Sequence, residues 1–423
     1  MRREHNARPR PAGRVTLAVR VGAAAAALGL PSLLLAVPAH AAQIGRVTQI
    51  NRVTQIDRVA QTPAALPRGC HAAPSWVDST PDSTLTPALG VTVTSWHGSS
   101  SYGAPLRVVV AAASAAHASF ATVTAPRLGS AVPTTALTST SGAVVGLNGD
   151  YFTWGPTGQI PLGVQVSGGV VRFAPATPTR AVGLGADGQL HYAYVRVSGS
   201  AVVTAAGSSH RIALSAVNAP SSTGVSLVTG YGAKQPRRGG WFVLVRAGVA
   251  VSSSARDPGG PRGDDVLLVT SAARRALLSG VRAGNQVAVK AAVVNQDGLV
   301  MTEAVGSGAE IVRRKAVVAD CTSTLGRSTR PRTVLAWNAS DGRMWFVAVQ
   351  SVGSGRSHPG NLGLTYGETA DLIRKLGATD AALLDGGGST TLAVRQSGRV
   401  VRVDAPAASP QRPVTDAMVW RLR

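Results

Sequence analysis

A short polar stretch near the C-terminus has the residue types of a binding or catalytic site. Consecutive glycines expose backbone N–H groups and permit conformations that a side chain forbids, so such a loop can form a concavity that binds an anion. The lysine and the following helix of a nucleotide-binding loop do not accompany it. The alternative is a glycine-rich crossover between strands, in which the carboxylate caps the turn. The stretch LLDGGGSTTL comprises Asp385, Gly386, Gly387, Gly388, Ser389, Thr390 and Thr391.

Two more segments place polar side chains at the ends of apolar strands. In GLNGDYFTWG, Asn148 and Asp150 leave such a strand and enter an aromatic patch, which suits a sugar ring. The alternative there is an Asn-Gly turn beside a core aromatic cluster. In RPRTVLAWN, Arg332 opens a strand, where its guanidinium can grip a phosphate in a bidentate manner. The alternative is an exposed arginine at a sheet edge.

The elements that must position these side chains are mostly strands. From about residue 74 onward, short runs rich in β-branched residues alternate with glycine and proline turns. Asp341-Gly342 indicates a hairpin between TVLAWN and RMWFVAV. Helices are expected over about 366–376, where Thr365 and Glu368 form a capping box, and over 271–280. The sequence therefore predicts an α+β fold, a strand-rich single domain with a few covering helices.

The N-terminus has the order of a secretory signal peptide: a basic segment, an apolar run over 21–37 and an Ala-His-Ala cleavage site. An uncleaved membrane anchor is the alternative. Three hexads, QIGRVT, QINRVT and QIDRVA, follow, and they indicate a basic spacer that either binds the cell wall or is a membrane-proximal linker. We thus expect a signal peptide at 1–41, a spacer at 42–73 and one catalytic domain at 74–423, secreted or wall-associated, without a stable membrane span after cleavage.

The chain carries a formal net charge of +22. Its basic residues are almost all arginine, which can reflect a GC-rich genome or an anionic partner such as a phosphorylated polymer. No nucleic-acid-binding motif is present, so we expect no nucleic-acid partner. Two cysteines, Cys70 and Cys321, are typical of a disulfide in an exported chain, worth roughly 4–5 kcal/mol in the chain-entropy model. Two buried thiols are the alternative. No zinc-binding pattern is present, and we expect no metal or other cofactor.

Taken together, these stretches resemble the phosphodiester glycosidase family over roughly 100–423. LLDGGGSTTL is the most specific match. LNGDYF, the strand after Arg332 with its hairpin, LGLTYGETADLIRKLGA and QRPVTDAMVW are similar to other family motifs and follow in order. Two positions depart from the family: Asp150, where a glycine is frequent, and Ser354-Gly355-Arg356, where an aspartate-glycine pair is common.

The resemblance implies a hydrolase that removes a sugar, such as N-acetylglucosamine, from a sugar-1-phosphodiester, with a phosphorylated glycan or teichoic-type polymer as substrate. We expect Asp385 to be the carboxylate nearest the anomeric carbon and Asp150 to be a possible second one. Expected substrate-binding groups are Asn148, Arg332, Gly386, Gly387, Gly388, Ser389 and Thr390. A protein of another class remains open: a non-catalytic wall- or polysaccharide-binding protein that keeps the fold.

Overall fold

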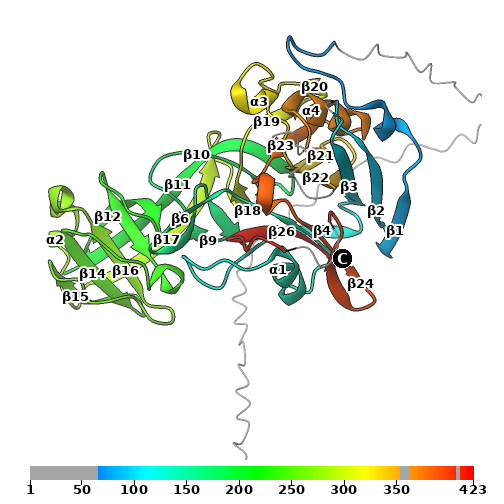
Figure 1. Ribbon diagram of the computed structural model, residues 1–423. Helices are drawn as coiled ribbons and strands as arrows, with labels where there is room; N and C mark the ends of the chain where they lie inside the picture. Colours follow the sequence, from blue (N-terminus) through cyan, green and yellow to red (C-terminus); the bar gives the residue numbers. More distant parts are fainter. Residues whose placement is uncertain (1–64, 102, 353–362, 406–409) are drawn as a thin grey trace, which may run out of the picture. The chain divides into compact units, whose positions relative to one another are not determined.

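The structure, a computed structural model, describes residues 65–101, 103–352, 363–405 and 410–423. The expected signal peptide and most of the expected spacer lie outside the described residues, as do Ser354, Gly355 and Arg356. Three sheets and one hairpin account for most of the described chain (Figure 1). Among the described residues, no helix is both long and apolar enough to cross a membrane.

An eight-stranded sheet carries the elements that present Arg332 and Asp385. Its central strands β21 and β22 are almost wholly buried, which fits their nearly continuous apolar sequence. The Asp341-Gly342 turn joins them, so the predicted hairpin is confirmed. In spatial order the strands are β1 (Ser83–Ala88), β2 (Val91–Ser99), β3 (Pro105–Ser114), β22 (Arg343–Ser351), β21 (Arg332–Asn338), β23 (Asp380–Leu383), β19 (Glu310–Arg313) and β20 (Ala316–Val317).

A five-stranded sheet packs on one face of this sheet. Side chains alternate along a strand, so Leu335 and Phe346 face the five-stranded sheet and Trp420, while Val334 and Val347 face the opposite layer. The Phe346 and Trp420 rings stack at 4.1 Å between centroids. The five strands are β25 (Arg399–Arg402), β24 (Leu392–Gln396), β5 (Val145–Asn148), β26 (Asp416–Leu422) and β4 (Ala118–Thr124).

An eleven-stranded sheet forms the third part of the fold. Seven of its strands, β12 to β11 in spatial order, close on themselves through the β11–β12 pairing, and their apolar side chains fill the enclosed core. In order the strands are β12 (Ser208–Val217), β13 (Val225–Val228), β16 (Val266–Thr270), β14 (Trp241–Arg246), β15 (Val249–Ser254), β17 (Gln286–Asn295), β11 (Leu190–Ala205), β10 (Thr179–Gly185), β18 (Met301–Gly306), β8 (Gln165–Ser167) and β9 (Val170–Phe173); a separate hairpin joins β6 (Phe152–Gly155) to β7 (Gly158–Pro161).

Helices contribute little, and the predicted α+β class is wrong: the described chain is a mainly β structure. Two of its four α-helices are single turns, α2 (Ala276–Ser279) and α3 (Thr324–Arg327), and α1 (Thr134–Thr140) has seven residues. The helix expected over 271–280 becomes a short 3₁₀ turn followed by α2, because no side chain caps its start and only Leu278 is buried. Further 3₁₀ turns lie at Ser75–Asp78, Gly230–Gly232 and Gly387–Ser389.

The helix α4 (Tyr366–Lys375) was predicted correctly. Thr365 accepts the Glu368 backbone N–H, and the Glu368 carboxylate accepts the Thr365 backbone N–H in return, so both members of the capping box are present. The helix covers the face of the eight-stranded sheet opposite the five-stranded one, through Leu372 and Ile373. It thereby fixes the segment around Tyr366, which reaches the candidate site.

Candidate active site

Three turns that are distant in sequence converge at one edge of the sheets. Because β23 is antiparallel to β21, the end of β23 lies beside the start of β21, with Leu383 opposite Val334. Asp385 and Arg332 therefore flank the same edge. The end of β5 joins them, since the Asn148 side-chain amide donates to the Asp385 main-chain oxygen at 2.7 Å. The Asp385 N–H donates in turn to the Gly149 oxygen at 3.0 Å.

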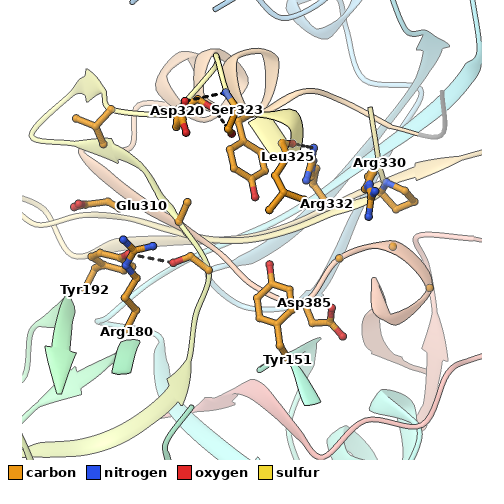
Figure 2. A pocket seen from close by; sticks show the side chains of 18 of the residues that line it. Tyr151, Arg180, Tyr192, Glu310, Asp320, Ser323, Leu325, Arg330, Arg332 and Asp385 are labelled. Atoms are coloured by element: carbon orange, nitrogen blue, oxygen red, sulfur yellow. Dashed lines mark hydrogen bonds between the residues drawn. The ribbon is translucent and has the colours of Figure 1, made fainter. Parts of the chain in front are cut away.

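A pocket of about 1020 Å³ opens at this convergence (Figure 2). Its walls come from both the eight-stranded and the eleven-stranded sheets, and they combine arginines, tyrosines and carboxylates. Of the residues predicted for the site, Asp385, Arg332 and the three glycines line it. The other ionisable lining residues are Tyr151, Arg180, Tyr192, Tyr194, Glu310, Arg313, Asp320, Arg330, Tyr366 and Arg412.

Asp385 is the carboxylate that stands beside the glycine loop. Its side chain is half-buried, and burial raises its pKa to about 6, against the opposing effects of the Ser389 hydroxyl and the Arg412 guanidinium. Figure 2 shows the Tyr151 ring beside it. A carboxyl group with this pKa is mostly ionised at pH 7 yet exchanges a proton close to neutrality, which suits a group that changes charge during a reaction.

The glycine loop offers fewer free donors than three consecutive glycines suggest. The Gly387 N–H donates to the Pro331 oxygen at 3.0 Å, and the Gly386 N–H contributes a hydrogen bond to the Asp385 carboxylate. Among the described residues, only the Gly388 N–H of the three lacks a protein acceptor. Gly387 has φ +58°, a conformation that favours glycine, and a Cβ on Gly388 would lie 2.4 Å from the Arg412 guanidinium.

Arg332 lines the pocket but is largely held by the protein. Its Nε donates to the Leu364 oxygen at 2.8 Å, and one terminal nitrogen donates to the Ser328 oxygen. The guanidinium lies over the Tyr366 ring, 4.5 Å from the centroid. Burial lowers the pKa of this arginine. Its charge therefore faces the pocket from a fixed position, with part of its donor capacity already used.

Asn148, Ser389 and Thr390 lie behind the pocket wall instead of in it. Asn148 is fully buried, and its Oδ1 accepts the Thr391 N–H at 3.0 Å and the Thr333 hydroxyl at 3.1 Å. Thr390 is equally buried and shares the Thr333 hydroxyl. The Ser389 hydroxyl accepts from Arg412 at 3.3 Å. The structure thus brings these residues together, but as supports of the loop.

Asp150 also lies away from the pocket lining. It is buried beside Asp416, and burial together with the Asp416 charge raises the pKa of Asp150 well above its usual range. The Asp150 carboxylate accepts the Gly163 N–H at 2.6 Å, while the Asp150 N–H donates to Asp416 at 2.7 Å. This carboxyl pair holds the backbone of the turn that supports Asp385. Among the described residues, no cluster of acidic, histidine or cysteine side chains has the make-up of a metal site.

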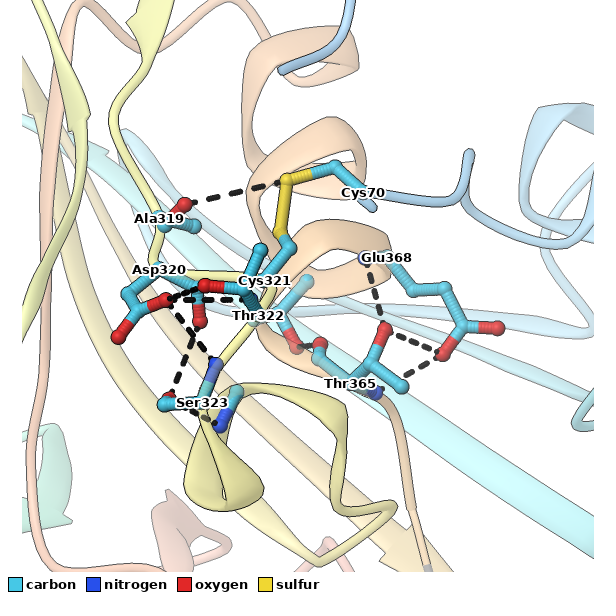
Figure 3. Close-up of a disulfide and its surroundings, with 10 residues drawn as sticks. Cys70, Ala319, Asp320, Cys321, Thr322, Ser323, Thr365 and Glu368 are labelled. Atoms are coloured by element: carbon cyan, nitrogen blue, oxygen red, sulfur yellow. Dashed lines mark hydrogen bonds between the residues drawn. A yellow bond between two sulfur atoms is a disulfide. The ribbon is translucent and has the colours of Figure 1, made fainter. Parts of the chain in front are cut away.

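Cys70 and Cys321 form a disulfide, as the sequence predicted (Figure 3). The bond ties the start of the described chain to the segment before α3, one residue from the pocket-lining Asp320. Asp320 accepts hydrogen bonds from the backbone of Thr322 and Ser323, which shape this part of the pocket wall. A side chain at Gly367 would contact both cysteines, so α4 packs closely against the bond.

Comparison with known proteins identifies the part of the chain that carries most of this site. The sequence model described as phosphodiester glycosidase matches residues 240–420. This segment matches the phosphodiester glycosidase family. The resemblance predicted from the motifs is thereby confirmed over these residues, which include Arg332, Asp385 and Arg412 but neither Asn148 nor Asp150. No curated protein matches the chain.

Solved structures with the same fold include two bacterial proteins. A hypothetical protein from Synechocystis has 20% sequence identity and a TM-score of 0.64, with 82% of this chain and 64% of that protein covered. The present chain therefore spans less than two thirds of that protein. A Burkholderia pseudomallei protein, named as exported, has 20% identity and a TM-score of 0.56, with 75% and 74% covered.

A third solved structure is the catalytic domain of zebrafish N-acetylglucosamine-1-phosphodiester α-N-acetylglucosaminidase, auto-inhibited by its pro-peptide. It has 10% identity and a TM-score of 0.41, with 81% of this chain and 87% of that one covered.

Sequence reasoning missed several groups that line the pocket near the phosphodiester glycosidase motifs. Arg412 belongs to the QRPVTDAMVW motif, but its isolated position in sequence gives no sign that it reaches the glycine loop. Tyr366 appeared only as the first residue of a helix. Arg180 and Tyr194 come from strands that carry no recognisable motif. Only the tertiary arrangement of β10, β11, α4 and the loop before β26 brings these side chains to one place.

Proposed function

We propose that this protein is an exported hydrolase that releases a sugar from a sugar-1-phosphodiester. The observation that carries the proposal is the half-buried Asp385 in a pocket lined by arginines, within a segment that matches phosphodiester glycosidases. A carboxylate suits the positive charge that develops at an anomeric carbon, and arginines suit the departing phosphate. Both requirements are met by side chains of one cavity.

In this proposal Asp385 is the carboxylate nearest the anomeric carbon. The bond between that carbon and the phosphate oxygen breaks, and the phosphate monoester leaves with the electron pair. Water then adds to the sugar and releases a proton. Because a phosphate monoester has a second pKa of about 6, it leaves without the strong acid that an ordinary alcohol needs. The ionised Asp385 stabilises the oxocarbenium-like state, directly or as a nucleophile.

The phosphate is proposed to bind between Arg412, Arg332 and the Gly388 N–H. Arg412 is exposed at the loop, where a Cβ on Gly388 would touch its guanidinium, so it lies within reach of the same ligand as the loop. Arg332 lines the same pocket and adds a positive charge in a fixed position. Charge-assisted contacts of this kind are roughly twice as strong as neutral hydrogen bonds.

The buried polar residues are proposed to support this site without touching substrate. Asn148, Ser389 and Thr390 hold the loop through the hydrogen bonds described above. Asp150 shares its buried environment with Asp416 and is assigned to the same supporting role, because a residue 2% exposed cannot reach a sugar in the pocket. Of the two carboxylates expected from the sequence, Asp385 is the only remaining candidate. The proposed mechanism therefore uses one carboxylate.

Export is part of the proposal. The order of basic, apolar and Ala-His-Ala segments within residues 1–41, the Cys70–Cys321 disulfide and the shared fold of a Burkholderia protein that is named as exported all support it. A phosphorylated glycan or teichoic-type polymer at the cell wall is the proposed substrate source, with residues 42–73 as spacer and 74–423 as the catalytic domain.

The test is release of free sugar from a p-nitrophenyl phosphodiester of N-acetylglucosamine-1-phosphate. We expect N-acetylglucosamine and p-nitrophenyl phosphate as products, both detectable by chromatography. Free p-nitrophenol with sugar-1-phosphate retained would indicate cleavage on the other side of phosphorus and would reject the glycosidase assignment. Salt-sensitive binding to isolated cell walls without sugar release would favour the non-catalytic wall-binding protein.

A further inference from the structure

The pocket extends past Asp385 to a wall built mainly by the eleven-stranded sheet, with β19 of the eight-stranded sheet beside it. We call this the far wall: Arg180 of β10, Tyr192 and Tyr194 of β11, and Glu310 and Arg313 of β19. Figure 2 shows Arg180, Tyr192 and Glu310 grouped together, apart from Asp385 and Tyr151. A volume of about 1020 Å³ lies at the upper end of the range that holds drug-sized ligands, roughly 300–1,000 Å³. The cavity therefore has room for more than one sugar and one phosphate.

Arg180 and Tyr194 form an ordered pair at the far wall. The Arg180 Nε donates to the Tyr194 hydroxyl at 3.1 Å, and the guanidinium lies 5.4 Å from the centroid of that ring. Tyr194 is nonetheless 49% exposed. The Tyr192 hydroxyl donates to the Gly308 oxygen at 3.1 Å, which anchors the neighbouring ring. Within the described part of the chain, the two terminal nitrogens of Arg180 have no protein acceptor, and they lie beside an exposed aromatic face.

The pocket lining carries more positive charge than is needed to bind the single negative charge of one phosphodiester. Its lining has five arginines and three carboxylates among the described residues. Glu310 accepts from Arg313, with 2.8 Å to its Nε, and Asp320 is engaged by Thr322 and Ser323. No described carboxylate lies within ion-pair distance of Arg180. A sugar phosphodiester carries one negative charge, which Arg332 and Arg412 already face.

We propose that the far wall binds a second anionic group of the substrate, so that the leaving group is a chain with a further phosphodiester and not a neutral alcohol or sugar. Arg180 is the specificity-determining residue and Tyr194 orients it. The inference rests on the proposed function and deepens it. Arg180, Tyr192 and Tyr194 lie outside residues 240–420, so the family match does not assign this property.

The test compares two phosphodiesters of N-acetylglucosamine-1-phosphate that differ only in the leaving group. One carries a glycerol phosphate dimer, and the other carries an uncharged ethylene glycol oligomer of the same length. We expect kcat/KM to favour the anionic ester at least tenfold at low salt, with the preference shrinking as salt rises. Arg180→Gln should reduce this preference about tenfold. Arg399→Gln, an exposed arginine of β25 outside the pocket, should leave it unchanged.

Binding of the free glycerol phosphate dimer, measured by calorimetry, separates the two proposals. Wild-type protein should bind it, and Arg180→Gln should weaken binding about tenfold. If sugar is released but neither ester is preferred, or if Arg180→Gln keeps the preference and the affinity, the far-wall assignment is wrong while the glycosidase stands. If no sugar is released from either ester, the glycosidase assignment fails, and loss of dimer binding in Arg180→Gln still supports the anionic site.

Discussion

The side-chain amide of Asn148 holds the main-chain oxygen of Asp385 at 2.7 Å, across 237 residues of sequence. The same side chain accepts hydrogen bonds from Thr391 and Thr333. One fully buried group thus joins the end of β5, the start of β21 and both sides of the glycine loop. The position of the proposed catalytic carboxylate depends on it.

Asn148→Ala should therefore destabilise the fold and reduce activity together. It leaves the Asp385 oxygen and the Thr391 N–H buried without a partner, and each such group costs about 1–3 kcal/mol. We expect a loss of roughly 2–4 kcal/mol in urea unfolding. Asn285→Ala, which removes the acceptor of a single turn N–H, serves as control and should cost about 1 kcal/mol. Equal losses in the two variants would contradict the role given to Asn148.

Asp385→Asn should abolish sugar release and leave the fold intact. A carboxylate that faces the reacting carbon is required for the charge it supplies, so we expect kcat/KM to fall by at least about a thousandfold. Asp264→Asn, an exposed carboxylate outside the pocket, is the matched control and should keep full activity. Substantial turnover by Asp385→Asn on the p-nitrophenyl phosphodiester would remove Asp385 from the mechanism.

The same variant should be more stable than wild type at neutral pH. Burial raises the pKa of Asp385 to about 6, so between about pH 4 and pH 6 the folded protein holds a proton that the unfolded chain, with a pKa of about 4, has lost, and at higher pH the folded protein must keep the carboxylate charged in its half-buried place. The stability that Asp385 contributes is present below pH 4 and is lost as pH rises through 6. Asp385→Asn should gain on the order of 2 kcal/mol at pH 7.5 and little at pH 4, as measured by denaturant unfolding.

Activity should rise with pH through the pKa of Asp385. If the ionised carboxylate is the active form, kcat/KM for a phosphodiester increases between pH 5 and pH 7 with an apparent pKa of about 6. The phosphodiester itself does not titrate in this range, so the enzyme supplies the transition. A profile that falls over this interval would show that the protonated form of Asp385 acts, as a general acid.

Alanine at Gly387 and alanine at Gly388 should have different effects, the first on stability and the second on substrate binding. Gly387→Ala meets open space but forces an alanine to φ +58°, which should cost about 1 kcal/mol of stability. Gly388→Ala places its Cβ 2.4 Å from the Arg412 guanidinium, which must move. We expect Gly388→Ala to raise KM severalfold with little change in melting temperature. The comparison of KM and melting temperature in the two variants tests the proposed phosphate position.

Reduction of the disulfide should lower both stability and substrate affinity. The bond closes a loop of 251 residues, so its loss costs about 4–5 kcal/mol in the chain-entropy model. Because Cys321 follows the pocket-lining Asp320, we also expect KM to rise in the Cys70→Ser/Cys321→Ser variant. Thermal unfolding with and without a reducing agent checks the first expectation, and an unchanged melting temperature would contradict it.

The parts of the site that depend on local sequence could be predicted, and those that depend on distant partners could not. The capping box of α4 and the Asp341-Gly342 hairpin follow from residues a few positions apart. The aromatic patch that follows Asn148 favours a sugar-binding role for its amide, but the amide donates to the main chain of a loop 237 residues away. Asp150 was assigned to catalysis, and only the register of β26 against β5 reveals Asp416 beside it.

The predicted fold class was wrong for a related reason. The apolar residues over 271–280 have helical spacing, which favours a helix. This spacing does not reveal that the segment lacks a side-chain cap and has no broad surface to cover. The strand-rich pattern was correct, and the pairing of β10 and β11 with the rest of the chain decides where Arg180 and Tyr194 stand.

Arg180 and Tyr194 of the far wall belong to the eleven-stranded sheet, whereas the eight-stranded sheet presents Asp385, so the proposed choice of leaving group and the proposed bond cleavage depend on different sheets. Exchange of the antiparallel ribbon formed by β10 and β11 would alter which aglycones are accepted while the bond-breaking apparatus stays in place. Given the proposed role of the far wall, we expect that laboratory variants can be retargeted by replacing this one ribbon while the glycine loop is left unchanged.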